Sequence, residues 1–155
     1  GDYVAAADVS GIVQEMGLRI TKIRDFGGQL HIIPNSRIEQ VTNFMGSKMR
    51  VMFDVRIAYE TDIDMAFAVL EETFADMRAS MPAIEEGPDV LGVQELSDSG
   101  VIVRVVARSA PMAQWSLERE MRKRIKLAFD ESGIEIPYPK RYVMIHKKDN
   151  REGGD

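Results

Sequence analysis

Few side chains in this sequence have the type and spacing that catalysis or metal binding requires. The chain has no cysteine, which excludes disulfides and thiolate chemistry and removes the usual ligands of structural zinc. Its two histidines, His31 and His146, lie far apart, and neither belongs to a carboxylate pattern typical of a metal ligand or a general base. Because His31 lies between the apolar Leu30 and Ile32, we expect it on the solvent side of a strand, with no partner within reach.

The acidic and serine residues also lack the surroundings of a catalytic or metal site. The acidic residues at 85–89 do not have the alternating oxygen ligands and central glycine of a calcium loop, so we interpret them as a solvated loop. Those at 60–64 are interpreted as favourable charge at a helix N-terminus. No Gly-x-Ser-x-Gly or Gly-x-Gly-x-x-Gly motif occurs. We therefore expect neither an enzyme nor a cofactor or metal site.

A run of basic residues lies at 119–126, interleaved with acidic ones. We interpret it as the solvated face of a helix, with an i,i+4 ion pair between Glu118 and Arg122, in preference to a binding patch. Trp115, the only tryptophan, is expected to be a packing anchor early on that helix. The formal net charge of −5 argues against nucleic acid as a partner, because phosphate binding needs a basic face.

The residues that precede 48 predict short strands. Runs rich in β-branched residues at 9–13, 18–24 and 30–33 are separated by glycines, and the Gly27-Gly28 pair has the conformational freedom of a hairpin turn. Strands at this spacing are typical of a small, strongly bent sheet or a partial barrel. A sheet of about 45 residues buries little apolar surface, so we expect it to pack against a neighbour.

The residues after 48 predict an α+β domain. The expected order, β-α-β-β-α-β, is that of a ferredoxin-like fold, with both helices on one face of an antiparallel sheet. Pro82 and Gly87-Pro88 are expected to interrupt the chain, Pro111 to stand where the second helix starts, and Gly133 to follow its end. The predicted elements are, in chain order, a strand at 50–57, a helix capped by Thr61 or Asp62 with an apolar stripe of Ile63, Ala66, Phe67, Leu70, Phe74 and Met77, strands at 90–96 and 101–108, a helix with a stripe of Leu117, Met121, Ile125 and Ala128 or Phe129, and a strand at 134–136.

We divide the chain into a β domain at 1–47, a ferredoxin-like domain at 48–140, and a C-terminal strand with a disordered tail at 141–155. No apolar run of about 18 residues, the length that spans a bilayer, is present. The first residues lack a starting methionine and look like the beginning of a strand, which suggests a fragment or a processed chain. The residues by themselves indicate a catalytically silent, two-part α+β protein.

Two blocks of sequence carry a resemblance to a known family. They are Ile33-Pro34-Asn35-Ser36 in the first half and Gly133-Ile134-x-Ile136-Pro137-Tyr138-Pro139 in the second, and shorter matches occur in the same order over nearly the whole chain. With these blocks the chain resembles the small-conductance mechanosensitive channel family. The shorter matches include Gly1-Asp2-Tyr3-Val4, Gly17-Leu18-Arg19, Asn43-Phe44, Ile57-Ala58-Tyr59 and Arg124-Ile125-Lys126.

The resemblance implies a function that composition and periodicity do not show. Proteins of this family are homoheptameric channels of the cell membrane that open under tension and release ions and small solutes on hypo-osmotic shock. Their cytoplasmic part has an Sm-like β domain, an α/β domain and a C-terminal strand that joins a small barrel, and together these form a hollow vestibule with side portals. The resemblance implies that the pore helix and the other transmembrane helices lie upstream of Gly1.

The same resemblance suggests which residues couple the β domain to the pore. The turn after the Ile-Pro-Asn block faces the pore-lining helix in the family, so Asn35, Ser36 and Arg37 are the candidate coupling residues. A purely structural role, in which Asn35 holds a capped turn, explains Asn35 and Ser36 equally well. The alternative function is a soluble Sm-like and ferredoxin-like interaction module that binds RNA or a metabolite, although no aromatic and basic RNA-recognition block is present.

Overall fold

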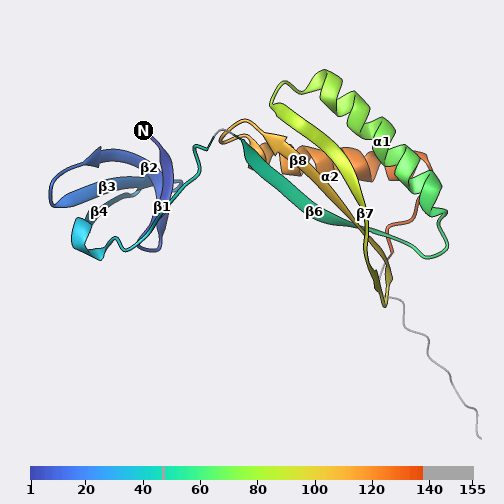
Figure 1. The fold of residues 1–155 in the computed structure, drawn as a ribbon, viewed down its shortest axis with the longest axis horizontal. Helices are drawn as coiled ribbons and strands as arrows, with labels where there is room; N and C mark the ends of the chain where they lie inside the picture. Colours follow the sequence, from blue (N-terminus) through green and yellow to red (C-terminus); the bar gives the residue numbers. More distant parts are fainter. Residues whose placement is uncertain (47, 138–155) are drawn as a thin grey trace, which may run out of the picture.

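In the computed structural model the chain forms two separate β-sheets, one from each half of the sequence (Figure 1). The structure describes residues 1–46 and 48–137. The first sheet has five strands, the second has three, and two long helices accompany the second. The predicted α+β class, with a small β domain ahead of an α/β domain, is confirmed. The strand expected at 142–145 and the tail after it lie outside the described residues.

The first sheet is antiparallel throughout and follows the order β4-β3-β2-β1-β5. Its β3–β4 turn uses the predicted glycine pair, because Gly28 has φ +86° and donates its amide to the carbonyl of Asp25. Sequence patterns missed the short last strand, which joins β1 from the opposite side. The strands are β1 (Tyr3–Ala6), β2 (Val9–Met16), β3 (Ile20–Asp25), β4 (Leu30–Pro34) and β5 (Val41–Asn43), and the one-turn 3-10 helix η1 (Asn35–Arg37) follows β4.

The core of the β domain is small, as its length predicts. Val4, Ala6, Ile23 and Ile33 are its buried apolar residues. Strands β2 and β3 approach closely at Gly11, where an added Cβ would lie 2.1 Å from the carbonyl oxygen of Arg24. Only glycine therefore permits this contact, and it allows the sheet to bend over its few core side chains.

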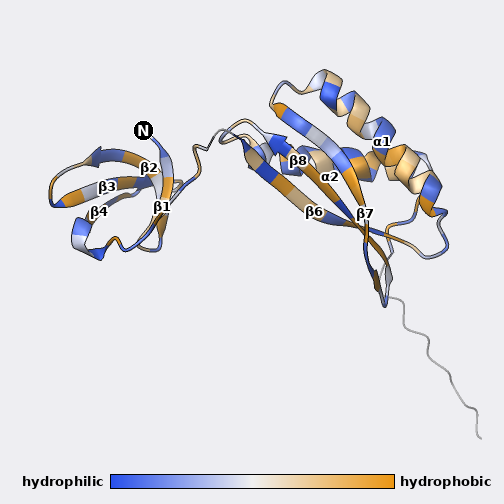
Figure 2. Cartoon of the chain, viewed as in Figure 1, coloured by the Kyte–Doolittle hydropathy of each residue, from blue (hydrophilic) through white to orange (hydrophobic). Residues whose placement is uncertain are grey.

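The second sheet is antiparallel, with the order β6-β8-β7, and both helices pack on one face of it (Figure 1). Apolar and polar residues alternate along β6 and around α1 in Figure 2, as one-sided burial requires. The inward residues of the strands and the stripes of both helices form one buried cluster. The elements are β6 (Met49–Ile57), α1 (Ile63–Ser80), β7 (Ile84–Ser97), β8 (Gly100–Ser109) and α2 (Gln114–Glu131).

The predicted signals at the helix ends are found in the structure. Asp62 caps α1, and its carboxylate accepts from the amides of Asp64 and Met65 at 2.9 and 3.2 Å. Gly133 follows α2 with φ +69°, and Ile134 donates its amide to the carbonyl of Phe129. This is the hydrogen bond of a Schellman motif, which satisfies a free carbonyl at the end of the helix.

Three local predictions in the α/β domain are wrong. Strand β7 does not begin after Gly87-Pro88 but at Ile84, and it passes through this pair because register shifts against β8 absorb the irregular residues. Helix α2 begins at Gln114, after a turn in which Ala113 donates its amide to Ala110, so Pro111 precedes the helix. The expected strand at 134–136 is irregular, although the amide of Ala58, just after β6, donates to the carbonyl of Glu135 and Ile134 is buried in the core of the domain.

We predict that Gly11→Ala destabilises the β domain by about 1–3 kcal/mol, because the new methyl group overlaps backbone atoms that cannot move without breaking the β2–β3 pairing. Hydrogen exchange of the β2 and β3 amides measures the effect. Gly46→Ala is the matched control, since a Cβ there would meet no atom within 4 Å. Equal protection in the two variants would show that the close approach at Gly11 is not required.

Candidate assembly and coupling surface

The β domain presents two sheet edges that lack a partner strand among the described residues. These edges are β4 and β5, at the two ends of the strand order. They also expose apolar side chains, since Ile32 on β4 is 58% exposed and Val41 on β5 is 53% exposed. Unpaired backbone groups beside exposed apolar residues form a template for another strand. The small core and the open edges together make this domain suited to pairing with neighbours.

Asn35 holds one end of the β domain together. Its side-chain oxygen accepts from the Thr21 hydroxyl at 2.8 Å, and its side-chain nitrogen donates to the Gly17 carbonyl at 2.9 Å. Its backbone amide donates to the Arg19 carbonyl at 2.9 Å. These three bonds tie the end of β4 to the β2–β3 turn, which indicates a structural role for Asn35.

Ser36 and Arg37 differ from Asn35 in their surroundings. Both are exposed, and within the part of the chain that the structure describes neither side chain has a hydrogen bond or ion pair. An open hollow of about 480 Å³ at the same end of the domain is lined by Gly1 and Met16 as well as Asn35. Gly1 and Asn35, the first residue of the turn that carries Ser36 and Arg37, thus line the same hollow.

The structure corrects the expectation that His31 has no partner. Its Nε2 lies 2.9 Å from the Asp25 carboxylate, and both side chains are partly exposed at the β3–β4 turn. The hydrogen bond from His31, assisted by the Gln29 amide, holds the pKa of Asp25 below its ordinary value. Sequence patterns missed the pair because the hairpin, and not helical or strand spacing, brings these residues together. Among the described residues, no group of three or more His, Cys, Asp or Glu side chains could hold a metal ion.

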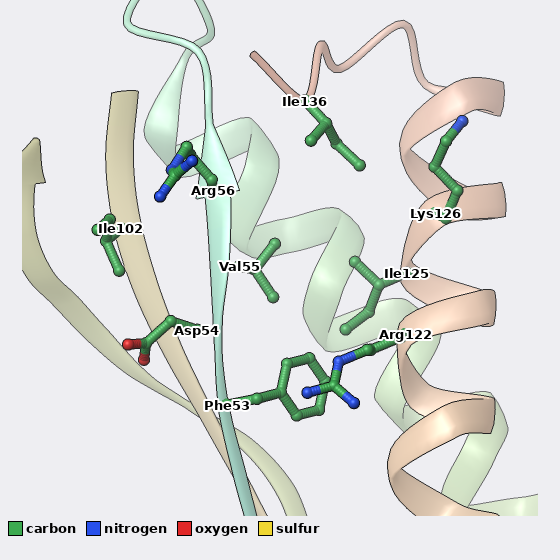
Figure 3. A pocket seen from close by; sticks show the side chains of 9 residues that line it. All are labelled: Phe53, Asp54, Val55, Arg56, Ile102, Arg122, Ile125, Lys126 and Ile136. Atoms are coloured by element: carbon green, nitrogen blue, oxygen red, sulfur yellow. The ribbon is translucent and has the colours of Figure 1, made fainter. Parts of the chain in front are cut away.

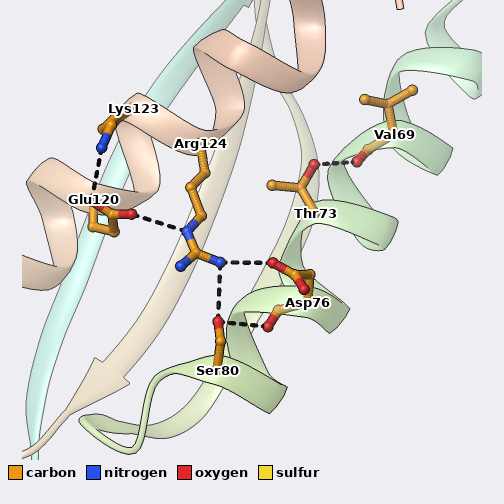
Figure 4. A network of polar contacts seen from close by, with 7 residues as sticks. All are labelled: Val69, Thr73, Asp76, Ser80, Glu120, Lys123 and Arg124. Carbon is orange, nitrogen blue, oxygen red and sulfur yellow. Dashed lines mark hydrogen bonds and ion pairs between the residues drawn. The ribbon is translucent and has the colours of Figure 1, made fainter. Parts of the chain in front are cut away.

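The basic residues of α2 are mostly engaged in ion pairs. The predicted pair of Arg122 with Glu118 is present at 2.6 Å. Arg124 contacts Glu120 of its own helix at 3.0 Å and Asp76 of α1 at 2.7 Å, so it clamps the two helices together (Figure 4). The bond from Arg124 keeps the pKa of Glu120 below its ordinary value. These contacts support a solvated, salt-bridged helix face.

A groove runs beside β6, where Figure 3 shows α2 facing the strand. Its volume is about 350 Å³. The Arg122 guanidinium lies 4.6 Å from the centre of the Phe53 ring, within cation–π range. On the other face of the sheet, Asp54 accepts two bonds from Arg104, at 2.7 and 2.9 Å, and these lower its pKa. The lining residues are Phe53, Asp54, Val55, Arg56, Ile102, Arg122, Ile125, Lys126 and Ile136.

Trp115 packs between the two domains. Its ring centre lies 5.5 Å from that of Tyr3 and 6.2 Å from that of Phe44, and the Tyr3 and Phe44 rings are themselves 5.6 Å apart. Trp115 is thus a packing anchor, as expected. Sequence patterns could not identify its partners, which come from the other domain.

Comparison with known proteins assigns both halves of the chain. Residues 1–46 match the family model for the mechanosensitive ion channel β-domain, and residues 51–136 match that for the C-terminal region of the mechanosensitive ion channel MscS. The chain belongs to the MscS family. Its members are ion channels and not enzymes, so the expectation of a non-enzyme is confirmed. MscS channels are oligomers in the membrane.

Individual relatives support this membership. The chain is 39% identical over 148 residues to a small-conductance mechanosensitive channel of Caldanaerobacter subterraneus. The aligned region covers 96% of this chain and 52% of the relative. It is 27% identical to the moderate conductance mechanosensitive channel YbiO of Escherichia coli, over 88% of this chain and 19% of that protein. The chain thus spans about half the length of the first relative.

Solved structures share the fold of this MscS-family chain. The closed-state crystal structure of MscS from Helicobacter pylori superposes with a TM-score of 0.80 at 20% identity, over 96% of this chain and 59% of that one. The cryo-EM structure of MSL1 from Arabidopsis thaliana has a TM-score of 0.64 at 19% identity, over 90% and 52% of the two chains. In the described part of this chain, neither helix has the apolar length that crossing a membrane requires.

We predict that Asn35→Ala lowers the stability of the β domain by about 1–3 kcal/mol, because it leaves the Thr21 hydroxyl and the Gly17 carbonyl without their partner. Urea unfolding followed by the amide NMR signals of β3 and β4 measures this loss. Ser36→Ala is the control and should leave stability unchanged. A loss equal in both variants would contradict the assignment of the structural role to Asn35.

We predict that His31→Ala raises the pKa of Asp25 towards its ordinary value of 3.8, because the largest cause of the lowered pKa is the bond from His31. A carboxylate with a lowered pKa stabilises the fold above its ordinary pKa, and this contribution disappears as pH falls through the folded value. Carboxyl NMR titration measures the change. The pKa of Asp54 is the internal control and should not change, since it is lowered by Arg104 and not by His31. An unchanged pKa of Asp25 in the variant would exclude the His31 contact as its cause.

Proposed function

We propose that this chain is the cytoplasmic vestibule of a channel of the cell membrane that opens under tension and releases ions and small solutes on hypo-osmotic shock. The observation that carries the proposal is the order of the two domains, both of which match the mechanosensitive channel family. The open edges of the β domain and the hollow that Gly1 shares with Asn35 support the proposal. The transmembrane helices would lie upstream of Gly1.

The open edges of the β domain support assembly into a ring. Strands β4 and β5 are the two edges of one sheet. Pairing β4 of one copy with β5 of the next is therefore a head-to-tail contact. When this contact repeats with a constant rotation, the copies close into a ring in which no strand edge of the β domain is left unpaired. We propose the homoheptamer of the family as that ring. Its vestibule walls would carry charges that concentrate counter-ions near the pore.

The residues of the 3-10 helix η1 have different roles in the proposed coupling. Asn35 holds the turn in place through Thr21 and Gly17, while Ser36 and Arg37 are exposed. We propose that Ser36 and Arg37 contact the pore helix that enters above Gly1.

The proposed channel part has three segments. Residues 1–47 and 48–140 would act as the β and α/β units, and 141–155 would supply the strand of the C-terminal barrel.

We predict that Arg37→Ala in the full-length protein raises the membrane tension needed for opening, because movement of the β domain is transmitted less effectively. Allosteric couplings are typically about 1–3 kcal/mol, which corresponds to a roughly 5–150-fold change in the opening equilibrium at fixed tension. Patch-clamp recording measures the threshold, and survival of osmotic downshock measures the physiological effect. Glu72→Ala, on the exposed side of α1, is the control.

Two results would contradict the proposed function. One is a full-length protein that passes no current under tension although it reaches the membrane. The other is a genomic reading frame in which no apolar helix ends close to Gly1, since the pore would then have no source. An unchanged threshold in the Arg37 variant would remove only the coupling role of Arg37.

A further inference from the structure

The groove beside β6 combines an apolar floor with a basic rim. Strand β6 is an edge of its sheet, and no strand pairs with its outer side among the described residues. Phe53 and Ile136 supply the exposed apolar surface beneath this edge, and the nearly buried Val55 and Ile125 lie behind them. An unpaired strand edge next to an apolar groove is the arrangement that receives an added strand.

The rim of the groove has more positive charge than the groove itself neutralises. Arg56 is exposed and has no ion pair among the described residues. Arg122 and Lys126 line the same space, and within the described residues the ion pairs of both are with acidic residues of α2. The one acidic residue of the lining, Asp54, is bound through both oxygens to Arg104. An occupant with acidic and apolar side chains would therefore match the groove.

The opposite edge of the same sheet carries such a segment. We define the β7 arm as residues 91–97, the half of β7 that leads to the β7–β8 turn and extends beyond the helices (Figure 1). Leu91, Val93 and Leu96 on this arm are 62%, 50% and 69% exposed. Glu95 is exposed and has no ion pair within the described residues.

The β7 arm is held in a defined position. The Tyr59 hydroxyl, just after β6, donates to the Ser97 carbonyl at 2.6 Å, and the Ser97 hydroxyl donates to the Gly100 carbonyl at 2.8 Å across the turn. Three exposed apolar side chains on an anchored strand cost little entropy to bury against a partner. The arm thus has apolar side chains that match the floor of the groove and an acidic side chain that matches its basic rim.

We propose that the β7 arm of one copy of the chain docks along the free edge of β6 and its basic groove in the next copy. Arm and groove lie on opposite edges of one sheet, so the contact is head-to-tail and closes only by rotation into a ring. Leu91, Val93 and Leu96 cover the apolar floor, and Glu95 faces the basic rim. The proposal rests on the ring assembly of the proposed function and adds a second level of contact, between α/β domains.

Cross-linking of single-cysteine variants tests this docking, because the chain has no cysteine of its own. One full-length chain carries Val93→Cys and a second, differently tagged chain carries Ile136→Cys. The two are co-expressed and treated with a short bismaleimide, so a mixed dimer on a denaturing gel arises only between copies. We expect strong cross-linking of this pair and background for Glu72→Cys with Ile136→Cys, since Glu72 lies on the exposed side of α1.

Charge exchange tests the role of the rim in the same assay. Arg56→Glu should reduce the cross-linked fraction roughly tenfold by placing like charges together, and Glu95→Arg in the partner chain should restore it. Restoration would exclude misfolding as the cause of the loss, because a substitution in the partner chain does not refold a misfolded variant. If neither substitution changes the cross-linked fraction, the assigned charge contact is overturned.

A second cysteine pair separates this proposal from the ring itself. Ile32→Cys on β4 with Thr42→Cys on β5 reports the β-domain contact. Cross-linking of that pair with only background for the arm and groove overturns the docking and leaves the proposed function intact. Failure of both pairs in a protein without tension-gated current overturns both. Cross-linking of arm and groove that arises only after removal of residues 138–155 assigns the groove to the chain's own C-terminal segment and also overturns the proposal.

Discussion

Unpaired strand edges are the constraint on which the rest of this structure depends. Neither sheet closes on itself, so β4 and β5 of the first sheet, and β6 and β7 of the second, each have one side without a partner strand among the described residues. The edges also expose apolar residues, such as Ile32 and Leu91. Backbone groups and apolar surface that remain in water favour association. The ring of identical subunits that we propose would pair these edges between neighbouring copies.

The two domains that carry these edges differ in how well they are packed. The β domain has few buried side chains and depends on close backbone contact at Gly11 and on the hydrogen bonds of Asn35. The α/β domain has a continuous core, and Arg124 joins its two helices across their exposed side. In the channel that we propose, this difference would let the β domain respond to a pore helix while the α/β domain keeps its shape. Trp115 connects the two domains.

The sequence predicted best the features that depend on local periodicity. The buried stripe of α1, the cap at Asp62 and the C-terminal glycine of α2 follow from helical spacing and end signals, and each is present. Irregular positions were predicted less well. The Gly87-Pro88 pair did not interrupt the chain ahead of the strand, since β7 already begins at Ile84 and register shifts against β8 keep the pairing on both sides of the pair. The pair of His31 with Asp25 depends on how a hairpin places two residues that no period connects.

The order of the elements, the two-part α+β class and the motifs that indicate the channel family could be read from the sequence, because hydrophobic spacing and short blocks are properties of the chain itself. Only the tertiary structure decided which residue does which task at those motifs. It assigned Asn35 to holding the turn and left Ser36 and Arg37 exposed. It also placed the β7 arm and the β6 groove on opposite edges of one sheet. The first outcome follows from hydrogen bonds between turns distant in sequence and the second from strand order, and periodicity encodes neither.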